Sequence, residues 1–130
     1  MKAPAARQGD LVFAIDTHFV MVPATPSPVP LPHIFSGEIT GAFSTNVNIM
    51  GKPAATVGST VDNTSPHVPV PPGVAFQNPP SNKGTIISGS GTVMINGKMA
   101  ARMSDSVMTC DELANQTGMI ISGAGSVLIG

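Results

Sequence analysis

Residues 4–10 read PAARQGD, residues 53–59 read PAATVGS and residues 99–105 read MAARMSD. A second string recurs in the same relation to the first: VNIMGK at residues 47–52, VMINGK at residues 93–98 and VLIG at residues 127–130. Paired strings in a constant order are typical of a repeat architecture. The sequence therefore predicts three copies of one structural unit.

The second string has the pattern of a strand that enters a hairpin. In each copy a Val and an Ile stand two positions apart, so they share one face of a strand. Where the two strings adjoin, Asn96 and Gly97 supply the positive φ values of a tight turn. The first Pro-Ala-Ala string has no strand before it, and the last Val-Leu-Ile strand has no string after it. We therefore predict an all-β fold, a small cone of three β-hairpin repeats about a pseudo-threefold axis, closed by pairing of the N- and C-terminal strands.

The composition agrees with a single all-β domain. The 130 residues include 14 Gly, 13 Pro and five Phe but no Trp or Tyr, and only 10% are charged. Such a composition is typical of short strands and turns. Residues 1–130 are expected to form one three-repeat domain. The alternative is an ordinary small sandwich of unrelated Gly-rich strands, which would leave the complementary chain ends without an explanation.

Charge and cysteine usage exclude several function classes. Six Lys and Arg against seven Asp and Glu give a formal charge of −1, and no basic cluster indicates nucleic-acid binding. Charged Arg7 and Asp10 precede any long apolar run, so we expect neither a signal peptide nor a spanning helix, and synthesis in the cytoplasm. Cys110 is the only cysteine, so its thiol is buried, reactive or a metal ligand and forms no internal disulfide.

Eleven of the 13 prolines lie in residues 23–32 and 66–80. Proline fixes φ and lacks an N–H, so both stretches are predicted to be extended surface connections and not helix or central strand. They can be interpreted as ligands for proline-recognising domains. They can also be interpreted as stiff spacers that position the neighbouring His33 and His67.

The histidines and the cysteine occupy related places in the repeat. His18 lies 13 residues after Ala5, His67 lies 13 after Ala54, and Cys110 lies ten after Ala100. Around a pseudo-threefold axis these three positions converge, with His33 as a fourth. Three imidazoles and one thiolate suit a structural zinc ion, one per chain. Taken singly, each would more simply be a hydrogen-bonded loop histidine or a small buried cysteine.

A site closed by four protein ligands stabilises and does not catalyse, so the protein is expected not to be an enzyme. Zinc binding contributes roughly 10 to 16 kcal/mol in small metal-dependent domains. The enzymatic alternative is a zinc hydrolase in which water replaces one ligand. No His-Glu-x-x-His motif supports it, and the seven carboxylates are scattered along the chain.

The strings at residues 4–7, 53–56 and 99–102, each tied to a Gly-rich Val-x-Ile strand, resemble the PAAR-repeat family. The resemblance covers nearly the whole chain. It implies a cone whose apex binds zinc through His and Cys and whose base sits on the trimeric spike of type VI secretion systems and related phage-like machines. Three departures from the family pattern stand out: Thr56 in place of Arg, Met99 in place of Pro and Ser104 in place of Gly.

The resemblance implies metal roles for His18, His67 and Cys110 by repeat position and for His33 by residue type alone. It also implies a structural tip that caps and sharpens the spike, aids envelope puncture and can carry effector or toxin cargo. We expect a monomer that binds one spike trimer, contacts the target membrane transiently, and is secreted or extracellular after firing. The alternative is a zinc-containing binding module or adhesin that uses its Pro-rich segments.

Overall fold

The computed structural model describes residues 2–114 and 116–130, and every regular element within these ranges is a β-strand. None of the described elements is a helix with the length and hydropathy needed to cross a membrane. The strands are β1 (Ala3–Ala5), β2 (Leu11–Met21), β3 (Val29–Gly41), β4 (Asn48–Ile49), β5 (Lys52–Pro53), β6 (Thr60–Asn63), β7 (Ala75–Phe76), β8 (Lys83–Ile86), β9 (Met94–Ile95), β10 (Lys98–Met99), β11 (Ser106–Met108), β12 (Gly118–Ile120) and β13 (Ala124–Ile129).

Six of these strands form a closed antiparallel barrel. Their order is β12-β11-β8-β6-β3-β2, and pairing of β12 with β2 closes the circle. Side chains alternate between the barrel interior and solvent, as the burial pattern of β2 shows. Strand β7 pairs with the far end of β2 and lies outside the circle. The predicted all-β cone is confirmed.

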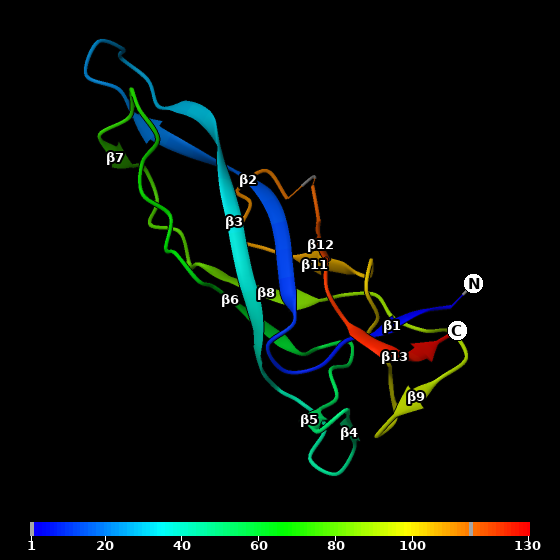
Figure 1. Ribbon diagram of the computed structural model, residues 1–130. Coiled ribbons are helices and arrows are strands. Elements are labelled where there is room, and N and C mark those ends of the chain that lie inside the picture. The colour runs from blue at the N-terminus through cyan, green and yellow to red at the C-terminus, as the bar shows by residue number, and fades with distance from the viewer. Residues whose placement is uncertain (1, 115) are drawn as a thin grey trace.

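Each repeat contributes two barrel strands and one small hairpin. The first repeat supplies β2 and β3 and then the β4–β5 hairpin, and the second supplies β6 and β8 and then the β9–β10 hairpin. The third supplies β11 and β12, and its last strand β13 pairs antiparallel with β1. This pairing rebuilds the third hairpin from the two ends of the chain and confirms the predicted closure. Figure 1 shows the three hairpins at one end of the molecule and the long β2–β3 hairpin at the other.

The three Pro-Ala-Ala strings meet at the centre in a ring of hydrogen bonds. The amide of Ala6 donates to the carbonyl of Ala101 (3.0 Å), Ala101 donates to Ala55 (3.1 Å), and Ala55 donates back to Ala6 (3.0 Å). All three alanines have no exposed surface. The side chain of alanine is a single methyl group, which is small enough to let three backbones approach one axis. Each of the three central amides is then paired with a carbonyl of the next repeat.

Two layers of core side chains follow the same threefold relation. The barrel layer repeats one valine and one isoleucine per unit, and the hairpin layer repeats one alanine and one isoleucine per unit. The barrel layer contains Val12, Val61, Val107, Ile39, Ile86 and Ile120, and the hairpin layer contains Ala5, Ala54, Ala100, Ile49, Ile95 and Ile129. All twelve side chains are buried.

One departure from the repeat pattern, Ser104 in place of Gly, leaves the backbone of the turn unchanged. Ser104 keeps the positive φ of its counterparts, with 79° against 84° at Gly9 and 96° at Gly58. A serine in this left-handed conformation carries a steric cost that glycine avoids. The backbone conformation of the turn is therefore retained although the residue type has changed.

The motif arginine has a definite role in the first and third repeats. Arg102 donates to the carboxylate of Asp105 (2.9 Å) and to the carbonyl of Gly130 (3.1 Å). Arg7 likewise lies beside Asp10 and donates to the carbonyl of Met50, the equivalent turn position of another hairpin. Each arginine thus ties a barrel turn to the end of a hairpin.

The second repeat replaces this ion pair with a neutral one. Thr56 stands in place of the arginine and Ser59 in place of the aspartate, and the hydroxyl of Ser59 accepts a hydrogen bond from the Thr56 amide (3.0 Å). Where the arginine is missing, Thr56, Ile95 and Asn96 line a hollow of about 270 Å³. Because both members of the pair change together, no charge is left without its partner.

Part of the first proline segment is strand, which differs from the prediction of a connection outside the sheet. Pro30 and Pro32 lie in β3 opposite Phe19 and Thr17 of β2. The amides of Thr17 and Phe19 point away from β3, toward the carboxylates of Asp111 and Glu112. These pairs are therefore not hydrogen-bonded across the ladder, so the missing N–H of each proline costs no strand hydrogen bond.

Candidate metal centre

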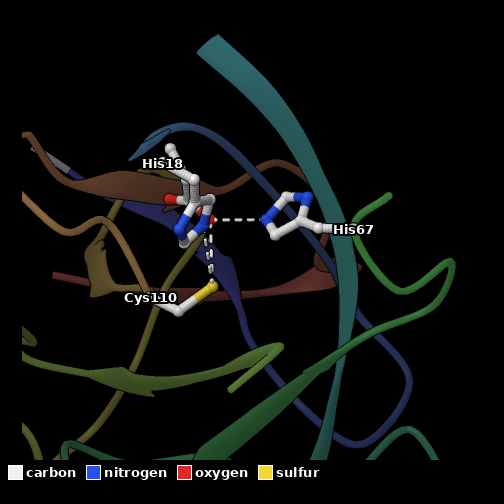
Figure 2. Close-up of side chains that lie close together, drawn as sticks. His18, His67 and Cys110 are labelled. Atoms are coloured by element: carbon white, nitrogen blue, oxygen red, sulfur yellow. Dashed lines mark hydrogen bonds and ion pairs between the residues drawn. The ribbon is translucent and has the colours of Figure 1, made fainter. Parts of the chain in front are cut away.

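Four side chains from all three repeats converge inside the end of the barrel that carries the β2–β3 hairpin. Asp16 and His18 lie two positions apart on β2, so strand alternation points both inward. His67 comes from the connection after β6, and Cys110 comes from the connection after β11. One donor atom from each of the four lies within 4.8 Å of the donor atoms of the other three. Figure 2 shows His18, His67 and Cys110 directed toward one another.

The distances within this cluster resemble the edges of a tetrahedral site. The Nε2 atom of His18 lies 3.6 Å from the Sγ atom of Cys110. A tetrahedral zinc ion with a Zn–N bond of about 2.0–2.1 Å and a Zn–S bond of about 2.3 Å would separate these atoms by about 3.6 Å. Oδ2 of Asp16 lies 2.9 Å from Nε2 of His67 and 3.3 Å from Sγ of Cys110. The cluster could therefore hold a metal ion with small side-chain adjustments.

Burial keeps the imidazole of His18 in the state that binds metals. His18 has no exposed surface, and burial, followed by the neighbouring His67, lowers its pKa. A neutral ring leaves one nitrogen with a lone pair for a cation. His18 is therefore a competent ligand at neutral pH.

The Cys110 thiol must lose a proton before it can bind a metal. Burial, followed by the charge of Asp16, raises the pKa of Cys110 to about 11. At neutral pH the thiol of the metal-free protein is therefore protonated. Its S–H can donate a hydrogen bond to Oδ2 of Asp16 or to Nε2 of His18. Metal binding would release that proton, so the apparent affinity would increase with pH.

Asp16 is a fully buried carboxylate with no Lys or Arg beside it. Burial alone would raise its pKa, but hydrogen bonds from His67, Thr109 and Cys110 together outweigh burial and lower the pKa. A buried negative charge is costly unless a cation or several donors compensate it. A divalent cation between Asp16 and the thiolate of Cys110 would be balanced by two negative charges.

His33 lies next to the cluster but is not one of the four converging residues. Its ring centre is 5.4 Å from that of His18 and 5.6 Å from that of His67. Its Nδ1 atom lies 2.9 Å from the carbonyl oxygen of Leu31, and its Nε2 atom lies 3.3 Å from the amide nitrogen of Val70. With both nitrogens on backbone groups, His33 ties the second proline segment to β3. Its role as a ligand stays a prediction.

The carboxylate of Glu112 faces the outer nitrogen of His18. Its Oε2 atom lies 3.5 Å from Nδ1 of His18, a buried atom with no other partner among the described residues. Glu112 is itself held by the amide of Phe19 (2.6 Å) and the side chain of Asn78 (3.0 Å). A carboxylate in this place favours a proton on Nδ1 and leaves Nε2 free to face the cluster.

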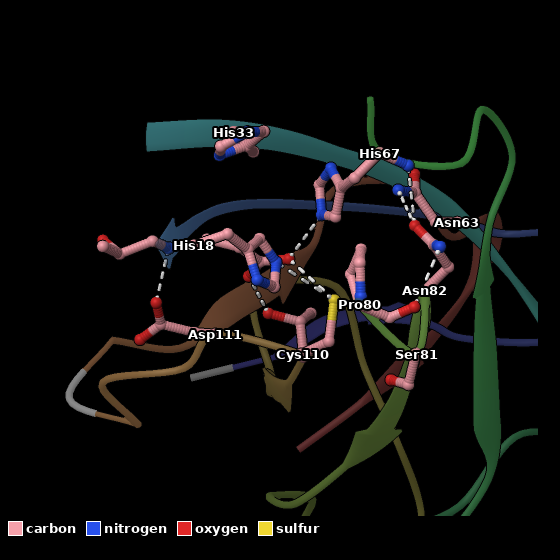
Figure 3. A network of polar contacts seen from close by, with 12 residues as sticks. His18, His33, Asn63, His67, Pro80, Ser81, Asn82, Cys110 and Asp111 are labelled. Atoms are coloured by element: carbon pink, nitrogen blue, oxygen red, sulfur yellow. Dashed lines mark hydrogen bonds and ion pairs between the residues drawn. The ribbon is translucent and has the colours of Figure 1, made fainter. Parts of the chain in front are cut away.

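The loop that carries His67 is fixed by Asn82. The side-chain oxygen of Asn82 accepts hydrogen bonds from the amide of His67 (2.8 Å) and from Nδ2 of Asn63 (3.1 Å). Figure 3 shows this network on one side of the cluster and Asp111 on the other. Phe76 of β7 packs 5.7 Å from the ring of His18 and helps to cover the site. The second proline segment thus acts as the cover of the cluster.

The repeat positions in the sequence found three of the four converging residues, His18, His67 and Cys110. They missed Asp16 and Glu112, because no equivalent carboxylate occurs in the other repeats. A signal for Asp16 was present: in an Asp-x-His sequence on a strand both side chains share one face. Nothing comparable marks Glu112, whose position depends on how the third connection folds against β2.

Residues 77–130 match a family model described as the PAAR motif. Searches found no matching curated protein and no matching solved structure. The matched residues include the third repeat, its Met-Ala-Ala-Arg string and Cys110.

Proposed function

We propose that the chain is a PAAR-repeat protein of contractile injection systems and that it caps the trimeric spike of such a machine. The proposal is supported by the PAAR-motif match at residues 77–130 and by two similar strings earlier in the chain, at residues 4–7 and 53–56. PAAR-motif proteins are structural proteins associated with the spike tip. A capping role assigns the hairpin end of the cone to the spike and the metal end to the point. Residues 1–130 would act as one domain.

The observation that carries this proposal is the threefold arrangement of the hairpin end within a single chain. The β4–β5, β9–β10 and β1–β13 hairpins have equivalent positions around the ring of central alanines. A closed threefold partner offers three identical surfaces, and one chain with three similar hairpins can contact all of them at once. We therefore propose one copy of a monomeric tip per spike trimer.

We also propose that the cluster holds one structural zinc ion. Two imidazoles and a thiolate are donors that zinc prefers, and the fourth place is taken either by Asp16, which converges with them, or by His33, which lies beside them. A fully coordinated ion would tie the first repeat, through His18 of β2, to the connections after β6 and β11 at the point of the cone. Such a site stiffens the part of a tip that meets an envelope first.

Co-purification with a cognate trimeric spike, followed by native mass spectrometry, tests the capping role. We expect a complex with one copy of this protein per trimer. Three copies per trimer, or no complex at all, would refute it. Metal analysis of the same complex reports the zinc content independently of the stoichiometry.

Envelope puncture, carriage of effector or toxin cargo, and release from the cell on firing follow from the capping role and remain part of the proposal. The second candidate, an adhesin that binds through its proline segments, has less support. Val74 and Gln77 donate amide hydrogen bonds to Met21 and Phe19, and Val70 contacts His33, so the second segment is occupied within the molecule. Replacing residues 23–28, which precede β3, with a Gly-Ser linker would abolish partner binding only under the adhesin hypothesis.

A further inference from the structure

We propose that the hairpin end is an electropositive docking face that carries Lys2, Lys52 and Lys98 together with exposed apolar side chains, and that the spike surface it meets carries acidic residues about its axis. This inference rests on the proposed capping function and specifies the chemistry of the partner. It is carried by the distribution of charge along the molecule and by the geometry of the hairpins.

Acidic side chains are absent from the segments that build the hairpin end. Residues 1–9, 39–61, 84–104 and 113–130 contain no Asp or Glu, although together they make up more than half of the chain. The seven acidic side chains lie in the barrel strands and turns and at the metal end. The overall formal charge of −1 therefore conceals a positive base and a negative remainder.

Two of the lysines occupy equivalent places, because Lys52 pairs with Ile49 as Lys98 pairs with Ile95, and Lys2 lies one position before Ala3, which pairs with Ile129 in the third hairpin. Lys52 and Lys98 begin β5 and β10, each directly after the glycine of a hairpin turn. Lys2 precedes Ala3, the first residue of β1, in the hairpin that the chain ends complete. All three are exposed. Each of the three hairpins therefore carries one lysine, at the equivalent position in two of them and one residue away in the third.

These lysines differ from the other basic residues in having no carboxylate partner within the described residues. Arg7 lies beside Asp10, Arg102 beside Asp105, and Lys83 bonds Asp62 at 2.7 Å. No ion pair involves Lys2, Lys52 or Lys98 among the residues that the structure describes. Three like charges at one end repel one another in the free protein, and acidic groups on a partner would remove that repulsion.

Apolar side chains accompany the lysines on the same hairpins. Met50, Met94 and Leu128 are 53%, 56% and 55% exposed. Specific protein interfaces typically combine apolar contacts with charged groups. Charges at an interface chiefly accelerate association and orient the two partners. The lysines would attract the acidic partner to the hairpin end, and the negatively charged metal end would be repelled by it.

The test is the association rate of the protein with its cognate trimeric spike, measured from about 50 mM to about 500 mM salt. The variant K2E/K52E/K98E should associate at least about tenfold more slowly at the lowest salt, with a smaller change in dissociation rate. The wild-type rate should fall as salt increases. Melting curves of the variants should match the wild type, since all three side chains are exposed.

A matched pair of single variants separates local charge from net charge. Lys52→Glu and Lys83→Glu change the net charge equally at an exposed strand lysine, but Lys83 lies on the barrel wall beside Asp62. Only Lys52→Glu should slow association. Lysine substitutions at acidic residues of the spike's end face should restore binding of the triple variant.

Wild-type binding that is independent of salt and unaffected by the triple substitution would overturn this inference and leave the capping function intact. Lysine-dependent binding to duplex DNA without binding to the spike would also overturn it. No binding of the wild-type protein to the spike at any salt would overturn the capping function, and the inference with it.

Discussion

The two ends of this cone differ in how closely they follow the threefold repeat. At the hairpin end, the alanine ring and the two core layers repeat three times with little change. At the metal end, three connections of different length and sequence replace the repeat: residues 22–28, 64–82 and 109–117. An axis of threefold symmetry can supply three equivalent ligands, but a tetrahedral ion needs a fourth. In the proposed site the fourth donor, Asp16 or His33, would come from the first repeat alone, so the threefold symmetry would be lost where an ion is held.

A smaller contrast exists within the regular end. Two repeats use an Arg–Asp pair to tie a barrel turn to a hairpin, and one repeat uses Thr56 and Ser59. Gly41 accompanies this change, because it stands where Ser88 and Ser122 donate to the two aspartates. A side chain at Gly41 would approach Thr60 to 2.5 Å. Near-symmetry thus tolerates a substitution when the interacting residues change together.

The largest effect should follow from breaking the closure of the regular end. Deletion of residues 127–130 removes most of the β1–β13 pairing and the buried Ile129. We expect loss of cooperative unfolding for the whole domain, because the ring of hairpins opens and its core layer becomes exposed. The melting transition by circular dichroism is the measurement. Deletion of residues 24–27, which are exposed in the β2–β3 turn, is the matched control and should leave the transition largely unchanged.

Removal of the metal should affect mainly the asymmetric end. Cys110→Ser, or chelation of the wild type, should abolish or strongly weaken zinc binding, because a hydroxyl is a poor substitute for a thiolate. Amide hydrogen exchange should then accelerate around His18 and His67 and stay slow at the central alanines, where the hydrogen-bond ring is remote from the metal. Near-zero zinc in protein purified without chelator would contradict the metal assignment.

A more moderate change should follow from Glu112→Gln. Loss of the carboxylate beside Nδ1 of His18 should lower zinc affinity by about tenfold, the effect expected for an outer partner of a metal-bound histidine. Competition with a chromophoric chelator measures the affinity. Glu38→Gln, at a carboxylate with no hydrogen bond in the described structure, is the control and should bind zinc as the wild type does. Equal affinities for the two variants would remove the positioning role of Glu112.

The smallest effect concerns the neutral pair of the second repeat. Ser59→Asp should destabilise the protein by about 2 kcal/mol, because it buries a carboxylate beside the carbonyl of Ala42 without a cation. Adding Thr56→Arg should recover about 1 kcal/mol of this loss by filling the hollow and restoring the pair. Urea unfolding of the four proteins of the double-mutant cycle measures the coupling. Strict additivity would mean that the arginine and aspartate act independently.

The structure of the hairpin end could be predicted from the sequence, whereas that of the metal end could be predicted only in part. Repeated strings specify repeated contacts, so the hairpins, the buried isoleucines and the pairing of the chain ends could be inferred from Val-x-Ile spacing and the complementary termini. The metal end depends on long connections whose path is set by tertiary contacts, such as Asn82 with His67 and Val70 with His33. The strand conformation of Pro30 and Pro32 could not be predicted for the same reason, since it depends on which edge of β3 has no hydrogen-bonded partner at these residues.

The third hairpin has one further consequence, for the order of the chain itself. Gly130 occupies the turn position that Met50 and Asn96 hold in the other hairpins, and the two ends of the chain lie near each other in Figure 1. A short turn joining the ends, with new ends between Met50 and Gly51, would preserve every strand pairing except the turn that is cut. Exposed turns are the sites where such circular permutation succeeds. The chain could therefore begin at any of the three hairpin turns without loss of its strand pairings. The observed order of repeats is one of three that the contacts permit.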